Sequence, residues 1–376
     1  MNDRLQFLES LKHEGDPLAD EVIAELVSEG SIQQVNEVLA EFRSNDQPVP
    51  EHLPDVVRRY LIATDAPPAW TDASRLARAH EFFLDDGMHV ASVLSFGAMV
   101  NCYAQPRPSK VLALTHGLAQ PQRRLSETSQ FVLNMMGPDQ FGTGGSFVPT
   151  IQKTRLIHAA VRFFITRSGR WDVEADGVPI CQQDLLGALM IFSVQVIDGM
   201  RRIGISVTET EAEDYYYVWR VTGTLLGIRE DAIPTTLAEA EELSRTVVEA
   251  SYAPSEEGVV LTRALLDLYA KLMPGRTFDG VVPAMIRQVV APEVADWMRV
   301  PRSRGWGGVV RGAARMMRLL ERAEDDSVVA RRVLDRSARM LLGLNVRQLT
   351  DGQSTALTVP GDLRERWQDR GFQVPG

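Results

Sequence analysis

One short segment with the pattern RxxHAxVR contains three side chains of types that bind anions or metals, two arginines and one histidine. On an α-helix each residue turns the chain by about 100°, so Arg155, His158 and Arg162 fall within an arc of about 60°. Apolar residues such as Ile157 and Phe164 cover the rest of this helix, which predicts that most of it is buried. A buried helix that turns one imidazole and two guanidinium groups the same way needs an anionic partner or a metal.

Two kinds of partner satisfy this pattern. Haem b would supply an iron for His158 and two propionates for Arg155 and Arg162. Alternatively, His158 is a hydrogen-bonded core histidine, and each arginine forms a structural salt bridge to an acidic residue elsewhere. The pattern alone favours the second interpretation, because isolated histidines are more often structural.

Further sequence blocks follow the helix in a fixed order. They are GVPICQQDL at 177–185, GMRRIGI at 199–205, EAE at 211–213, and Trp219-Arg220 followed by GTLLG at 223–227. This order resembles the rubber oxygenase family, also called the latex-clearing proteins, which contains a fungal endoplasmic-reticulum oxygenase of mycophenolic acid synthesis as well. The resemblance is densest over residues 110–230, is thinner over 60–345, and leaves out residues 1–55.

The resemblance implies a fold, a cofactor and three residue roles. It implies a globin-like helical domain that holds haem b, with His158 as the axial iron ligand. Arg155 and Arg162 would contact the haem propionates or hold the proximal side. The best known members of the family are secreted.

A second group of polar residues precedes the histidine. Arg124 and Thr128 share one face of a helix that begins near Pro121. The family carries such an Arg-x-x-x-Thr pair about thirty residues before its haem histidine, so the resemblance places Arg124 and Thr128 on the distal side. Some members have a lysine just before the threonine, where this chain has Glu127. Glu127 could act as a base or could point to solvent at the start of the helix.

The remaining candidates for chemistry are weaker. His116 precedes Gly117, which is typical of a helix end rather than of a catalytic site. Asp86 and His89 have the i, i+3 spacing of di-iron bundles, but a second such pair is missing. The family usually has asparagine where this chain has Cys181, so the role of that side chain is open.

The organisation of the chain is predicted to be all-α. Residues 1–50 form an N-terminal helical extension with two short amphipathic helices, over 18–27 and 32–42, and residues 51–376 form the haem-binding oxygenase-like domain. Only the segment 169–179 suggests a β-hairpin.

Composition excludes several classes of function. The 376 residues carry a net charge of −10, which argues against a nucleic-acid-binding protein. The two cysteines cannot build a disulfide framework, the first residues show no apolar signal segment, and no apolar run is expected to span a bilayer. The arginine-rich segment 299–347 is interpreted as a solvated face rather than a membrane-surface helix. These features predict a cytoplasmic location without membrane contact.

The sequence therefore predicts a haem b-dependent, dioxygenase-like oxidoreductase. Its partners would be dioxygen and an apolar small molecule, such as an isoprenoid or another alkene. A non-catalytic haem-binding gas sensor or carrier is the alternative, and a helical protein without haem, in which His158 is structural, is a third.

Overall fold

The computed structural model describes residues 3–31, 44–115, 121–272 and 280–303, together with residues 305, 307, 308 and 312. Every regular element within these ranges is a helix, which confirms the all-α prediction. The elements up to the helix with His158 are α1 (Asp3–Ser10), η1 (Leu11–His13), α2 (Pro17–Ser28), α4 (Asp55–Ala63), α5 (Ala73–Val93), the π-helix η2 (Leu94–Ala98), α6 (Met99–Tyr103), α7 (Pro106–Leu114), α8 (Pro121–Met135) and α9 (Phe147–Arg167). Those that follow are α10 (Val173–Asp176), α11 (Gln182–Phe192), α12 (Val194–Ile203), α13 (Glu209–Leu225), η3 (Glu230–Ala232), α14 (Leu237–Ser251), α15 (Glu256–Leu272), α16 (Val281–Val289) and α17 (Pro292–Trp297).

Local sequence sets where several of these helices begin. Two threonines start α13 and α14 with capping boxes, in which the hydroxyl accepts the N–H three residues on and a glutamate there accepts the N–H of the cap. The pairs are Thr208 with Glu211 and Thr236 with Glu239. Asp16 starts α2 by accepting the N–H of Ala19 at 3.4 Å. Each cap satisfies backbone donors that the helix cannot pair internally.

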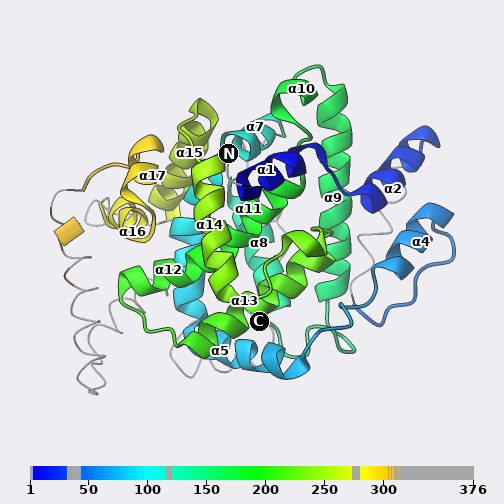
Figure 1. The fold of residues 1–376 in the computed structure, drawn as a ribbon, viewed down its shortest axis with the longest axis horizontal. Helices are drawn as coiled ribbons and strands as arrows, with labels where there is room; N and C mark the ends of the chain where they lie inside the picture. The colour runs from blue at the N-terminus through cyan, green and yellow to red at the C-terminus, as the bar shows by residue number, and fades with distance from the viewer. Residues whose placement is uncertain are drawn as a thin grey trace.

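The largest core lies between the long helices in the middle of the molecule (Figure 1). Helix α5 packs against α13 and α12, and α11 packs against α12, α13 and α14. The centre of this core is aromatic, with Phe83, Tyr215 and Tyr216 all enclosed. Close packing here depends on Gly199 of α12, because a Cβ atom there would lie 2.4 Å from Cγ1 of Val93 on α5.

A separate, smaller core joins α9 to two N-terminal helices. Helices α2 and α4 lie side by side against one flank of α9, on the right in Figure 1. Its apolar residues are Ala19, Val22, Ile23 and Leu26 of α2, Val56, Val57, Tyr60 and Leu61 of α4, Leu53, and Leu156 and Ala159 of α9. The predicted helix over 18–27 is thus confirmed as α2, whereas the helix expected over 32–42 lies outside the described residues.

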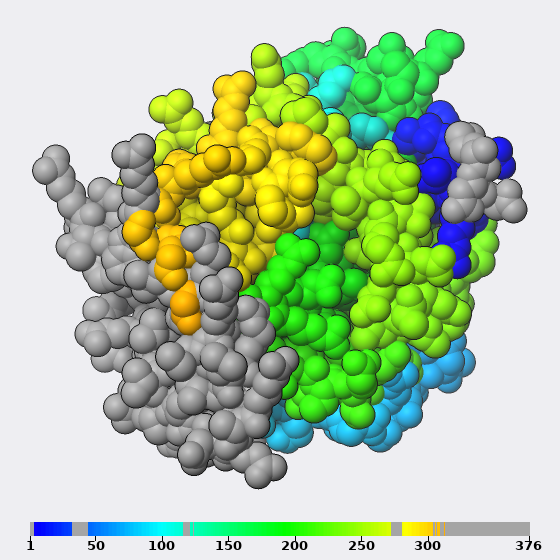
Figure 2. Space-filling view, turned by 60° about the vertical axis from the view of Figure 1, so that its left-hand side comes forward, coloured from blue at the N-terminus to red at the C-terminus, as the bar shows by residue number. Residues whose placement is uncertain are grey.

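The opposite side of the molecule is built from the C-terminal described helices. Figure 2 shows the chain near residue 200 (green) between α16–α17 (yellow) and α14 (yellow-green). The packing of α12 against both α16 and α14 agrees with this view. The helix with His158 is therefore separated from this face by the main core.

The segment 169–179 forms a turn and a short helix rather than the expected β-hairpin. Asp172 accepts hydrogen bonds from the N–H groups of Glu174 and Ala175, which starts the four-residue helix α10. The Trp171 indole is buried and donates to the carbonyl of Gly177 at 2.8 Å. Side-chain capping and burial of one indole therefore replace strand pairing here.

One stretch, Gln182–Ile203, is long and apolar enough to cross a membrane by length and composition, contrary to the expectation from sequence. It comprises α11 and α12, and 72% of its apolar window is buried inside the protein. Its hydrophobic surface is thus used in the core.

We expect Gly199→Ala to destabilise the protein. Helix propensity alone would favour alanine by about 1 kcal/mol. The added methyl group would overlap Val93, and overpacking of this kind typically costs about 1–3 kcal/mol. Urea unfolding followed by circular dichroism measures the balance. The double variant Gly199→Ala/Val93→Ala should regain part of the loss, and a stabilised single variant would contradict the tight α5–α12 contact.

Candidate functional site

Helix α9 carries the three residues that the sequence singled out. Its buried positions include Ile151, Leu156 and Ala159, which pack into the two cores on either side of the helix. The expectation that most of the helix is buried is wrong for one stripe, because Ile157 and Phe164 are 61% and 53% exposed. That stripe lines a groove of about 350 Å³, whose residues are Leu114, Thr115, Ile157, Ala160, Val161, Phe164, Ile165, Ser168 and Arg170.

His158 holds a neutral imidazole. Burial, followed by the positive charge of Arg162, lowers the pKa of His158 to about 4, while the charge of Asp16 acts in the opposite sense. Its Nδ1 is shielded from solvent and has no hydrogen-bond partner. A neutral imidazole is the form that binds a metal, and an unpaired buried ring nitrogen is unusual for a purely structural histidine.

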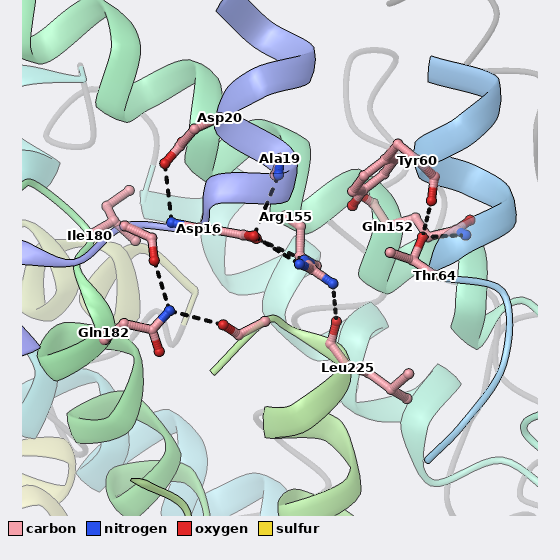
Figure 3. A network of polar contacts seen from close by, with 12 residues as sticks. Asp16, Ala19, Asp20, Tyr60, Thr64, Gln152, Arg155, Ile180, Gln182 and Leu225 are labelled. Atoms are coloured by element: carbon pink, nitrogen blue, oxygen red, sulfur yellow. Dashed lines mark hydrogen bonds and ion pairs between the residues drawn. The ribbon is translucent and has the colours of Figure 1, made fainter. Parts of the chain in front are cut away.

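Arg155 forms a buried ion pair with the N-terminal segment. Its Nε and Nη2 donate to the two carboxylate oxygens of Asp16, both at 2.8 Å, and its Nη1 donates to the carbonyl of Leu225 at 3.2 Å (Figure 3). The side chains of Asp16 and Arg155 are only 4% and 9% exposed. The sequence left a salt bridge open as the alternative to a propionate contact, and a salt bridge is what the structure shows for this guanidinium.

Arg162 forms a second ion pair with the same helix. Its Nε donates to Asp20 at 2.8 Å, and its Nη1 donates to the carbonyl of Ile180 at 3.0 Å. Ile180 has a φ of 51°, a left-handed conformation that is strained for a β-branched residue. Unlike Arg155, Arg162 keeps one buried nitrogen, Nη2, without a partner.

Three half-buried residues form one stripe on α8. Arg124, Thr128 and Phe131 follow the i, i+4, i+7 spacing. The Arg124 guanidinium lies 5.8 Å from the centre of the Tyr103 ring, and its Nη1 is buried without a partner. Glu127, by contrast, is exposed.

Aromatic rings connect this stripe to the core. The Phe131 ring stacks at 6.5 Å on Trp219, which also stacks on Phe192 at 5.5 Å. Phe131 contacts Phe147 of α9 edge-on at 5.8 Å, so α8 and α9 are neighbours. The indole Nε1 of Trp219 is buried and has no partner. The Arg124 stripe therefore borders an apolar interior that contains an unpaired donor.

The other candidates from the sequence lie apart from these helices or outside the described residues. His116 lies outside the described residues. His89 Nδ1 pairs with Asp86 at 2.9 Å, and no cluster of three or more metal-binding side chains occurs in the described part of the chain.

Cys181 belongs to a local polar cluster at the start of α11. Its Sγ accepts a hydrogen bond from Arg107 at 2.7 Å, and Arg107 also contacts Asp184 at 3.0 Å. Burial, and then the charge of Asp184, raise the pKa of Cys181 to about 12, so the thiol stays protonated at neutral pH. Asp184 accepts the N–H of Cys181 at 3.3 Å, so the cysteine occupies the cap position.

The residues of α9, α8 and α13 fit a haem group. His158 offers a neutral imidazole, and Arg124, Arg162 and Trp219 each keep a buried nitrogen donor without a partner. Phe131 and Phe192, which stack on Trp219, add the aromatic surface that a porphyrin packs against. A bound group that accepts hydrogen bonds would satisfy these donors, because an unpaired buried donor costs free energy.

Comparison with known proteins identifies the family. The family described as ER-bound oxygenase mpaB/B′/rubber oxygenase, catalytic domain, matches residues 84–319. The chain belongs to this oxygenase family. It is 30% identical over 283 residues to a rubber oxygenase from Streptomyces sp. (strain K30), covering 75% of this chain and 69% of that protein.

A solved structure supports the same assignment. The chain superimposes on latex clearing protein LCP in its closed state with a TM-score of 0.81 and 26% identity. The match covers 93% of this chain and 94% of that one. The helical oxygenase fold that the resemblance implied is thereby confirmed.

Sequence reasoning missed Asp16 and Asp20, because the motif blocks begin far downstream of them. The available signal was local: Asp16-Pro17 starts a helix, and Asp20 interrupts the apolar face of that helix one turn later. Their partners, 139 and 142 residues away, could not be identified without the fold.

We expect the two arginines to contribute unequally to stability. Arg155→Met leaves the Asp16 carboxylate buried and unpaired, which should cost about 3–5 kcal/mol. Arg162→Met should cost less, because the side chain of Asp20 is 36% exposed and water can replace the lost contact. Urea unfolding of both variants tests this order.

The double variant Asp16→Leu/Arg155→Met provides the control. Removal of both charges avoids the unpaired carboxylate, so it should regain most of the loss apart from about 1 kcal/mol for the helix cap. Equal losses for the two single variants would contradict the difference in burial.

Proposed function

We propose that this chain is a haem b-dependent oxygenase that cleaves a carbon–carbon double bond in an apolar, isoprenoid-type small molecule. The observation that carries the proposal is the neutral His158 imidazole on α9, in a member of the rubber oxygenase family. When bound, haem b would supply an iron centre able to take up dioxygen. Addition of dioxygen across an alkene yields two carbonyl groups with one oxygen atom each, so the reaction needs no external reductant.

His158 is the proposed iron ligand. A neutral imidazole binds iron without first losing a proton. Arg162 is the better of the two candidates for a propionate contact, because its Nη2 remains available. Arg155 has all three nitrogens engaged by Asp16 and Leu225, so its proposed role is to hold the proximal helix.

Arg124 and Thr128 are proposed to act on the distal side. The unpaired Nη1 of Arg124 can donate a hydrogen bond to an oxygen atom that is being transferred to the alkene, where negative charge develops. Thr128 lies one turn further along the same stripe and can orient the same oxygen through its hydroxyl. The exposure of Glu127, in the middle of α8, favours a surface residue over a catalytic base.

The apolar substrate is proposed to contact the aromatic residues beside this stripe. Phe131 and Phe192 are only partly buried and flank the Trp219 indole. Such rings hold an alkene by dispersion and exclude water from it. A cytoplasmic location remains part of the proposal, supported by two free cysteines, Cys102 and Cys181.

We expect the purified protein to bind haem b through His158. Protein supplied with haem should show a Soret band and a pyridine haemochrome spectrum of the b type. His158→Ala should lose most of the haem, because the iron–nitrogen bond is removed. The exposed His52 provides the control, since His52→Ala should keep the Soret band. Protein that stays colourless after haem is supplied would overturn the proposed function.

We expect Arg124→Ala and Thr128→Ala to keep haem and to slow oxygen-dependent turnover of an isoprenoid alkene. Loss of one preorganised donor typically costs about 10²–10³ in rate. Oxygen consumption and product carbonyls measure turnover. Glu127→Gln should leave the rate unchanged. Stable oxygen binding by the wild type, without turnover of any alkene, would favour a gas sensor or carrier instead.

A further inference from the structure

Two carboxylates at the start of α2, Asp16 and Asp20, pair with the arginines on either side of His158. Arg155 lies three residues before His158 and Arg162 four residues after it, so their ion pairs hold α9 at two points about 10 Å apart along its axis. We propose that Asp16 and Asp20 are positioning residues, which fix the rotation and register of α9 and thereby the direction of the His158 imidazole. The inference rests on the proposed role of His158 as the haem ligand.

No hydrogen bond at Nδ1 orients the His158 ring, so the placement of α9 matters more for the direction of the imidazole. A metal-binding histidine usually donates its second ring N–H to a carboxylate or carbonyl, which sets the ring orientation. The Nδ1 of His158 has no hydrogen-bond partner. The direction of the imidazole therefore depends on the packing around the ring and on the placement of α9, which carries it.

The Asp16 contact provides the directional restraint. Leu156 and Ala159 pack α9 against α2 and α4, but apolar packing is non-directional and permits small rotations. A guanidinium bound by both oxygens of one carboxylate fixes orientation as well as distance. Asp16 is itself held, since its Oδ1 also accepts the N–H of Ala19 at the start of α2.

Two glycines lie where the backbone passes close to the ion pairs. A Cβ atom on Gly227, which has a φ of +82°, would lie 2.8 Å from both Arg155 Nη2 and Asp16 Oδ2. A Cβ atom on Gly15 would lie 2.6 Å from Asp20 Oδ2. A side chain at either position would push these ion-pair atoms aside, and the positive φ of Gly227 independently favours glycine there.

Gln182 joins the three segments that surround Arg155. Its Nε2 donates to the carbonyls of Gly15 at 2.8 Å and Gly227 at 2.9 Å, and its Oε1 accepts the N–H of Arg229 at 2.9 Å. Figure 3 shows Asp16, Arg155, Gln182 and Leu225 gathered at this point. The start of α11 and the end of α13 thereby hold Asp16 in place against α9.

The test uses Asp16→Asn in the full-length protein, with Asp214→Asn as the matched control. Asp214 is also buried and pairs with two arginines, Arg75 and Arg78, but it joins α13 to α5 rather than α2 to α9. Hydrogen–deuterium exchange in the haem-free protein measures the protection of residues 155–165. Resonance Raman spectroscopy of the ferrous protein measures the iron–histidine stretching band, and transfer to apomyoglobin measures haem loss.

We expect Asp16→Asn to lower the protection of α9, to shift or broaden the iron–histidine band, and to speed haem loss by about 10- to 100-fold, the range typical for residues that orient a metal ligand. Asp20→Asn should do the same to a smaller extent and serves as the milder variant if Asp16→Asn folds poorly. Asp214→Asn should leave all three measurements on α9 at wild-type values.

Three results would overturn the inference. Unchanged exchange in α9 would show that the carboxylates do not restrain it. Faster exchange with an unchanged iron–histidine band would show that the carboxylates do not position His158. Equal effects of Asp214→Asn would show that the carboxylates act only through the overall stability of the protein. If the wild type binds no haem, the proposed function fails, while the exchange experiment still tests the restraint on α9.

Discussion

The buried ion pair between Arg155 and Asp16 is the interaction on which the arrangement around α9 depends. It joins two helices that are 139 residues apart in the chain, and its burial requires that both charges be present. The backbone conforms to it, with glycine at position 227 and the Gln182 amide bridging two neighbouring segments. A buried ion pair of this kind fixes the relative orientation of the two helices more than it adds to the net stability of the fold, because desolvation offsets much of its attraction.

The function proposed for His158 requires a defined position and rotation of α9. One flank of α9 contacts the main core and the other contacts α2 and α4, while an exposed stripe runs between them. Apolar packing holds the helix at a distance from its neighbours, and the two ion pairs set which way it faces. The imidazole is kept neutral by burial and by the positive charge of Arg162, so the charge that anchors the helix also keeps the ring in the form that binds a metal.

Three buried nitrogen donors near the helix with His158 have no hydrogen-bond partner, as do Arg58 Nε and Arg107 Nε elsewhere in the protein. Buried polar groups are almost always hydrogen-bonded, yet Arg124, Arg162 and Trp219 each leave one nitrogen without a partner. They lie on three different helices, together with a half-buried aromatic wall. All three positions lie within residues 84–319, the part of the chain that matches the oxygenase family.

Much of the fold followed from local sequence. The all-α class followed from helical periodicity, and residue order after RxxHAxVR identified the oxygenase family. The helix over 18–27 was visible because a capping residue precedes an apolar repeat. The segment 169–179 was misjudged, because Asp172 capping and Trp171 burial outweighed the glycine-bounded pattern of a hairpin.

The sequence by itself determined that His158, Arg155 and Arg162 share one helical face, since that depends only on the α-helical repeat. It could not choose between propionates and carboxylates as the partners of the arginines. Only the tertiary structure decided that Asp16 engages Arg155 through two nitrogens and that Asp20 pairs with Nε of Arg162, because the positions of both carboxylates depend on how α2 packs across α9. A pattern within one helix fixes which side chains point the same way, whereas the groups they meet depend on contacts between segments far apart in the chain.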